Sequence, residues 1–145
     1  MRFVKLIDET DIPKVAELEK EIFSDAWTEG GIKESFEQKQ ARIAGAYVDG
    51  ELKGYLIIYY VLDEAEIARI AVSEDARRLG LAGELMDWLL AFSEEHDIER
   101  ILLDVRESNV AARAFYTKWG FQIDGIRKRF YTDPVESAVL MSRDR

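Results

Sequence analysis

The chain has 145 residues, which suits one ordinary domain, and its 20 basic and 29 acidic residues give a net charge of −9. This acidic balance lacks the basic footprint of a nucleic-acid-binding protein and favours cationic partners, although solubility alone would also account for it. The absence of cysteine excludes disulfides, thiolate metal sites and a cysteine nucleophile. With no apolar run of membrane-spanning length and no signal-peptide pattern at the N-terminus, we expect a cytoplasmic protein that contacts neither nucleic acid nor membrane directly.

The first half of the chain predicts one strand, two helices and three further strands. Residues 2–7 alternate polar and apolar side chains, as a half-buried strand does. A helix begins at Thr10 or Asp11, with Pro13 tolerated in its first turn, and a weaker helical stretch covers residues 28–40. Strand-like runs follow at residues 42–48, 51–60 and 65–72, the first two joined by the hairpin signal Asp49-Gly50.

The second half alternates helices and strands. An apolar stripe at helical spacing predicts a helix that begins near Leu81 and carries Leu85, Trp88, Leu89 and Phe92 on one face. Residues 101–105 form a mostly apolar strand. A further helix, capped by Ser108 or Asn109, ends at Gly120, and strands at residues 121–124 and 136–141 flank a basic, aromatic loop. The order predicts one α+β domain over residues 1–145 with a mixed sheet.

The segment between the third long strand and the Leu81 helix carries the clearest chemical signal. Small residues at 80, 82 and 83 would let a ligand approach the backbone where the helix begins. Arg77 and Arg78 precede that helix, where its dipole disfavours cations unless an anion is bound. Two interpretations therefore stay open: an anion cradle, or a connector whose arginines pair with Glu74 and Asp75.

The pattern Arg77-x-x-Gly80-x-Ala82, placed directly after a strand, resembles the acetyl-CoA motif of the Gcn5-related N-acetyltransferase superfamily. This resemblance implies a mixed, mostly antiparallel sheet with about four helices, whose central strands, residues 70–72 and 100–105, splay apart. It also implies that loop amides bind the pyrophosphate of acetyl-CoA and that the preceding strand pairs with its pantetheine arm. The implied coenzyme-binding residues are Ile70, Ala71, Val72, Arg77, Arg78, Leu79, Gly80, Leu81, Ala82, Gly83, Asn109 and Tyr116.

A second constellation narrows the resemblance. Residues 104–109 (Asp-Val-Arg-Glu-Ser-Asn) and 114–121 are similar to the signature of the bacterial ribosomal-protein-alanine acetyltransferases, the RimI family. Residues 61–65, residues 127–131 and the pair Trp27-Thr28 add further matches, although Ala26 replaces the usual proline. The resemblance implies that the acceptor is the N-terminal alanine of a small-subunit ribosomal protein, approached as a basic peptide.

The same resemblance assigns the catalytic roles. It implies that Tyr116 is the acid that protonates the leaving thiolate; a phenol stays protonated at neutral pH. The competing interpretation is a helix tyrosine packed against Phe121. Asp104 stands where the family carries a glutamate base, and it is either that base, acting directly or through water, or a structural carboxylate at a strand end. Asn109 is a helix cap, a coenzyme contact, or both.

The acceptor side is the least specified part of the sequence. The resemblance gives Trp27 and Tyr131 as substrate-binding candidates, and strand or hairpin aromatics can equally be packing residues. No metal is expected, transfer is expected to be direct because no cysteine exists for a covalent intermediate, and the protein is expected to be a monomer or weak dimer. Two alternatives remain: an enzyme of the same fold that acetylates a small amine or a lysine side chain, and a non-catalytic acyl-CoA sensor.

Overall fold

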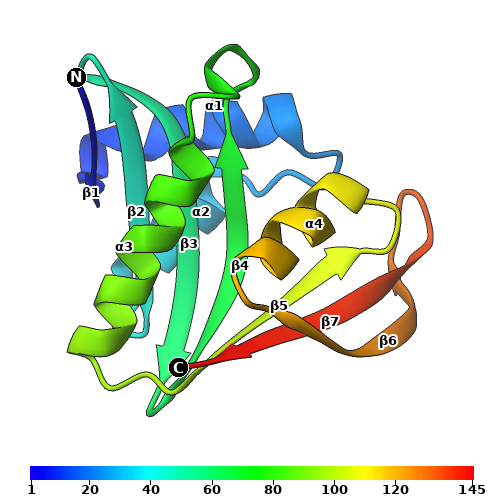
Figure 1. Ribbon diagram of the computed structural model, residues 1–145. Coiled ribbons are helices and arrows are strands. Elements are labelled where there is room, and N and C mark those ends of the chain that lie inside the picture. The colour runs from blue at the N-terminus through cyan, green and yellow to red at the C-terminus, as the bar shows by residue number, and fades with distance from the viewer.

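The computed structural model describes residues 1–145, folded around a seven-stranded sheet of order β1-β2-β3-β4-β5-β7-β6 (Figure 1). Four α-helices flank the sheet, and none of them is long and apolar enough to cross a bilayer. The strands are β1 (Arg2–Leu6), β2 (Ala41–Val48), β3 (Glu51–Val61), β4 (Glu64–Val72), β5 (Arg100–Arg106), β6 (Gln122–Tyr131) and β7 (Glu136–Asp144), and the helices are α1 (Ile12–Ile22), α2 (Glu29–Glu37), α3 (Leu81–Glu95) and α4 (Val110–Lys118).

The strands are antiparallel to their neighbours everywhere except in the central pair. β4 and β5 run parallel and pair only from Glu64 and Arg100 to Ile67 and Leu103. Beyond that point β4 remains paired with β3, and β5 remains paired with β7. The sheet therefore opens into a V between the last residues of β4 and β5, as the predicted splay requires.

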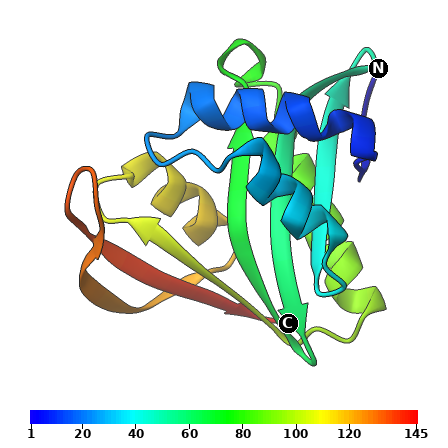
Figure 2. The ribbon, with the colours of Figure 1, turned by 180° about the vertical axis from the view of Figure 1, so that it is seen from behind.

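Helices cover both faces of the sheet. α1 and α2 pack on one face and α3 and α4 on the other, as the two opposite views show (Figures 1 and 2). Because successive side chains of a strand point to opposite faces, β3 feeds both hydrophobic cores. Leu56 and Ile58 belong to the core under α3, whereas Tyr55 and Ile57 belong to the core under α1 and α2. Burial on both faces fixes the register of this strand, because a slip of one residue would exchange the two sets.

Most of the predicted elements are confirmed, with ends that differ by a few residues. The hairpin between β2 and β3 turns at Asp49 and Gly50, whose φ angles of 50° and 83° suit a two-residue turn. The α3 stripe is buried at Leu81, Leu85, Leu89 and Phe92. The second helix ends at Glu37 rather than near residue 40.

The prediction for the region after Gly120 was wrong. We expected a short strand at residues 121–124 followed by a basic loop, but β6 continues to Tyr131. This strand lies at the edge of the sheet and is largely exposed, so no buried face imposes an alternating pattern on it. Its pairing with β7 also shifts between Ile123 and Gly125 and again between Arg127 and Tyr131. Bulges and basic residues are common features of edge strands, and here they obscured the strand signal.

Candidate active site

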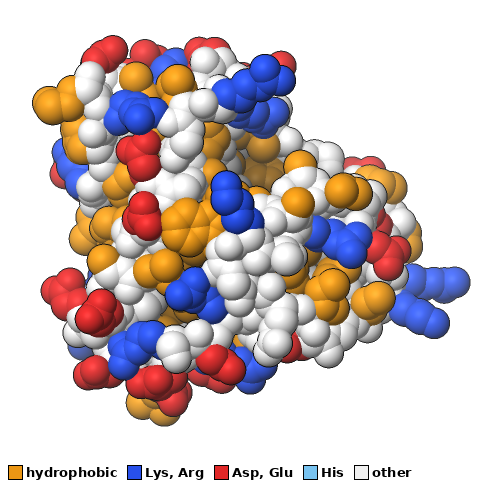
Figure 3. Space-filling view, viewed as in Figure 1, with side chains coloured by type: hydrophobic (Ala, Val, Ile, Leu, Met, Phe, Trp, Pro, Cys, Tyr) orange, Lys and Arg blue, Asp and Glu red, His pale blue; other side chains and the backbone are white.

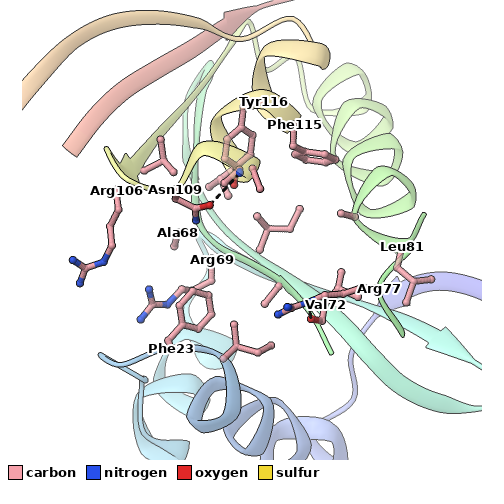
Figure 4. A pocket seen from close by; sticks show the side chains of 18 of the residues that line it. Phe23, Ala68, Arg69, Val72, Arg77, Leu81, Arg106, Asn109, Phe115 and Tyr116 are labelled. Carbon is pink, nitrogen blue, oxygen red and sulfur yellow. Dashed lines mark hydrogen bonds between the residues drawn. The ribbon is translucent and has the colours of Figure 1, made fainter. Parts of the chain in front are cut away.

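A cavity of about 870 Å³ occupies the V between β4 and β5. Its walls come from the last residues of β4 and β5, the loop before α3, α4 and the end of α1. On the face shown in Figure 3 the surface is hollowed between the two halves of the molecule, and hydrophobic side chains lie in the hollow. Arg77 and Arg106 lie on opposite sides of the cavity (Figure 4). We call the part near residues 77–83 the loop end and the part near Tyr131 the Tyr131 end.

The loop end presents unpaired backbone amides. A short 3₁₀ turn (Glu74–Ala76) leads into residues 77–80, and Gly80 has a φ of 81°, a left-handed conformation that glycine adopts without strain. The backbone amides of residues 78–83 donate no hydrogen bond within the protein, as expected for the first turn of a helix without a side-chain cap. Amides with free N–H groups at a positive helix end form a ready site for an anion.

The two arginines of this loop line the cavity and form no ion pair with Glu74 or Asp75. Arg77 donates its Nε–H to the carbonyl of Val72 over 3.3 Å. Asp75 is instead bound by Lys53 at 2.9 Å and by the Ser73 hydroxyl at 2.7 Å, and these hydrogen bonds lower the pKa of its carboxyl. The connector interpretation required the arginines to pair with these carboxylates, and that pairing is absent.

α4 places Asn109 and Tyr116 against the middle of the cavity. The Asn109 side chain accepts a hydrogen bond from the Ala112 amide at 3.1 Å, which makes it the N-cap of α4, and it also lines the cavity (Figure 4). Tyr116 lines the cavity with only 6% of its surface exposed and packs edge-on against Phe121, with ring centroids 5.6 Å apart. Tyr116 therefore packs against Phe121, as the competing interpretation expected, and also lines the cavity. Burial, and then the nearby Tyr131, raise the pKa of Tyr116, so the phenol remains protonated at neutral pH.

Several ionisable groups meet at the Tyr131 end. Asp104 and Tyr131 both line the cavity, and the Arg106 guanidinium lies 4.5 Å from the centre of the Tyr131 ring. Burial, followed by the negative charge of Asp104, raises the pKa of Tyr131 to about 12. Glu66, one strand away, has its pKa raised by partial burial and by the same aspartate. Asp104 is itself solvent-exposed.

Two residues predicted for the site do not line the cavity. Trp27 packs at the edge of the core under α1 and α2, with the Arg69 guanidinium 5.2 Å from its ring. Leu79 points away with 43% of its surface exposed, while its carbonyl accepts a hydrogen bond from Arg2. All the other predicted site residues line the cavity: Ile70, Ala71, Val72, Arg77, Arg78, Gly80, Leu81, Ala82, Gly83, Asp104, Asn109, Tyr116 and Tyr131.

Sequence reasoning missed part of the Tyr131 end. Phe23, Ser24 and Asp25, which follow α1, line the cavity together with Arg69 of β4. Arg69 had a detectable signal, because it is the one basic residue in the otherwise apolar run from Ile67 to Val72. The residues after α1 carried no such signal, because the sequence of a connecting segment does not indicate which strand it packs against. No group of three or more His, Cys, Asp or Glu side chains is arranged to hold a metal ion.

Comparison with known proteins identifies relatives over most of the chain. Residues 12–121 match the family model described as Acetyltransferase (GNAT) family. The [ribosomal protein bS18]-alanine N-acetyltransferase of Escherichia coli (strain K12) is 30% identical over 144 residues, which cover 98% of this chain and 97% of that protein. A Bacillus subtilis (strain 168) protein, provisionally assigned the same activity, is 37% identical over 132 residues, or 90% of this chain and 87% of its own length. The crystal structure of the Escherichia coli enzyme superposes with a TM-score of 0.92 at 29% identity, covering 99% of this chain and 94% of the other.

Proposed function

The chain belongs to the GNAT family of acetyltransferases, and we propose that it transfers the acetyl group of acetyl-CoA directly to the N-terminal amino group of a protein. The observation that carries this proposal is the cavity itself. It has a cluster of free amides and arginines at one end, a buried tyrosine in the middle, and an aspartate beside a second tyrosine at the other end. Donor and acceptor can therefore enter from different sides and meet near Tyr116.

The loop end suits the donor. The pyrophosphate of acetyl-CoA is an anion, and the amides of residues 78–83 with Arg77 and Arg78 offer it hydrogen bonds and positive charge. Beyond Ile67 the β5-facing edge of β4 has no strand partner, so its backbone groups, apart from the Val72 carbonyl that accepts from Arg77, can pair with an extended arm. We assign residues 70–72 of that edge to the pantetheine, and Asn109, the N-cap of α4, lines the same cavity.

The middle of the cavity suits the chemistry. Acetyl-CoA supplies an activated thioester, and an amine must lose a proton before or during its attack on that carbonyl. We assign Asp104 as the group that accepts this proton, directly or through water. We assign Tyr116, which lines the cavity and is kept protonated by its burial, as the group that donates a proton to the departing thiolate. The α-amino group has a pKa of about 7.7–8.0, so a modest base is sufficient.

The proposed acceptor is the N-terminal alanine of ribosomal protein bS18, the substrate in the names of the relatives. Asp25 and Asp104 lie near Tyr131, Glu66 lies near Asp104, and the whole chain carries a net charge of −9, which would attract a basic peptide. A cytoplasmic place of action forms part of this proposal, because ribosomal proteins are made and assembled there.

The test is an assay of coenzyme A release with three kinds of acceptor. We expect turnover with a peptide of the bS18 N-terminus and none with the same peptide already acetylated on its α-amino group. A panel of polyamines, an aminoglycoside and a lysine-containing peptide with a blocked N-terminus completes the set. Turnover of the panel without turnover of the free peptide would show that the acceptor is a different amine. Binding of acetyl-CoA without turnover of any acceptor would instead indicate a sensor.

A further inference from the structure

Arg69 is a nearly buried cation in the wall of the cavity. It lies in β4, its side chain is only 13% exposed, and it lines the cavity beside Phe23 (Figure 4). Removing a charge from water is costly unless it is paired and hydrogen-bonded. An arginine at this position therefore needs partners, and those partners define what it holds in place.

Most of those partners belong to one short segment, residues 23–27, which connects α1 to the cap of α2. Arg69 Nη2 donates to the Asp25 carbonyl over 2.9 Å and lies 3.3 Å from the Asp25 carboxylate. The guanidinium also lies 4.2 Å from the Phe23 ring centre and 5.2 Å from that of Trp27. A planar guanidinium can bind carboxylate and aromatic groups at the same time, which a lysine ammonium does less well.

The remaining partner anchors this arrangement in the core. Glu19 of α1 is fully buried, and its Oε1 lies 3.4 Å from Arg69 Nε. The same oxygen accepts a hydrogen bond from the Trp27 amide at 2.9 Å, while Oε2 accepts one from the Tyr55 hydroxyl. Glu19 and Arg69 thus fix both the backbone and the side chains of residues 23–27.

The segment held in this way forms one wall of the Tyr131 end. Phe23, Ser24 and Asp25 face the cavity, and the Ser24 hydroxyl donates to the Asp133 carbonyl of the β6–β7 turn over 3.3 Å. The charges of Asp25 and Arg69 both reach Tyr131, since they act in opposite directions on its pKa. Arg69 forms no hydrogen bond or ion pair with the loop at residues 77–83, so we expect its side chain to act at this end.

We infer that Arg69 is a positioning residue for the acceptor: it holds residues 23–27 in place as a wall of the Tyr131 end. This inference rests on the proposed function, because it takes the Tyr131 end as the place where the amine enters. Holding the wall in its bound arrangement lowers the entropy cost of acceptor binding without altering donor binding.

The test compares Arg69→Gln with Arg69→Lys, Asp25→Asn and the control Arg42→Gln. Arg42 also lies over an aromatic ring, that of Tyr60 at 5.4 Å, but on a part of the sheet away from the cavity. We expect Arg69→Gln to raise the KM for the bS18 peptide about tenfold or more while the KM for acetyl-CoA stays within about twofold, with Arg69→Lys in between. Arg42→Gln should leave both constants unchanged.

A second measurement is independent of catalysis. Amide hydrogen exchange of the free protein should become faster in residues 23–28 of Arg69→Gln and stay unchanged in residues 77–83. Asp25→Asn keeps the Arg69–Glu19 contact and should give a smaller rise in the KM for the peptide and a smaller increase in exchange of residues 23–28. This variant tests the inference if Arg69→Gln does not fold. Unchanged exchange in residues 23–28, or an equal loss of acetyl-CoA affinity, would overturn the inference. A wild-type enzyme inactive on the peptide overturns the proposed acceptor, and the exchange result then decides whether Arg69 fixes this wall.

Discussion

Ile67 and Leu103 form the last pair in the parallel ladder between β4 and β5, and beyond them the two strands no longer pair with each other. The residues that follow on each strand, Ala68 and Asp104, both line the cavity. One interrupted ladder therefore creates the free edge of β4, opens the cavity and exposes Asp104 to it.

Replacing Tyr116 by phenylalanine should remove the proton donor and little else. The ring packs against Phe115 and Phe121, and both contacts survive loss of the hydroxyl. We expect kcat to fall about 10²- to 10⁴-fold, with the dissociation constant of acetyl-CoA nearly unchanged. Steady-state kinetics and calorimetric titration measure the two quantities. Since its pKa is raised above the usual value near 10, wild-type Tyr116 should remain protonated up to at least that pH. A normal kcat in the variant would rule out Tyr116 as the acid.

Replacing Asp104 by asparagine should have an effect that depends on pH. Below the α-amine pKa of about 7.7–8.0 the acceptor arrives protonated and needs a base, so kcat/KM should fall most there. As the pH rises the free amine loses its proton in solution, and the deficit should shrink. Asp104→Glu keeps a carboxylate and should retain most of the activity. Profiles of kcat/KM from pH 6 to 9.5 for the three proteins provide the measurement. A deficit of equal size at every pH would indicate a structural carboxylate.

Replacing Arg77 by alanine should weaken donor binding. A charge-assisted hydrogen bond contributes about 1.5–3 kcal/mol, which corresponds to roughly 10- to 100-fold in the dissociation constant of acetyl-CoA. The matched control is Arg127→Ala, because Arg127 lies over Phe130 on β6 and does not line the cavity. Calorimetric titration with acetyl-CoA and with coenzyme A gives both values. Equal affinities of the two variants for acetyl-CoA would show that Arg77 does not bind the pyrophosphate.

Replacing Gly80 by alanine should strain the loop without creating a clash. A Cβ at this position would meet no atom within 4 Å, but the φ of 81° is left-handed and costs an L-residue about 1–2 kcal/mol. We expect a lower free energy of unfolding and weaker acetyl-CoA binding. Gly125→Ala is the control, since a Cβ there also meets open space and its φ lies outside the left-handed region. Denaturant unfolding of both variants measures the difference, and equal stabilities would contradict the strain argument.

The sequence by itself determined the elements whose pattern is locally complete. Strand-like runs mark β2 to β4, the apolar stripe marks α3, and Asp49-Gly50 marks the hairpin between β2 and β3. The loop at residues 77–83 also stood out, because its small residues and arginines lie within a few consecutive positions and resemble a known motif. The length of β6 was not recognisable, since an exposed and bulged edge strand has no buried face to impose alternation.

Only the tertiary structure decided the far end of the cavity. Glu19, Asp25 and Arg69 are separated by up to 50 positions in the chain, and they meet because α1 packs on the sheet face to which β4 presents Arg69. The same packing turns Trp27 away from the cavity and brings Phe23 and Asp25 to it. A charged residue in an apolar strand indicates that it will be paired. The segment that supplies its partners depends on how the helix packs on the sheet. That is why the loop at residues 77–83 could be singled out from the sequence and the opposite wall could not.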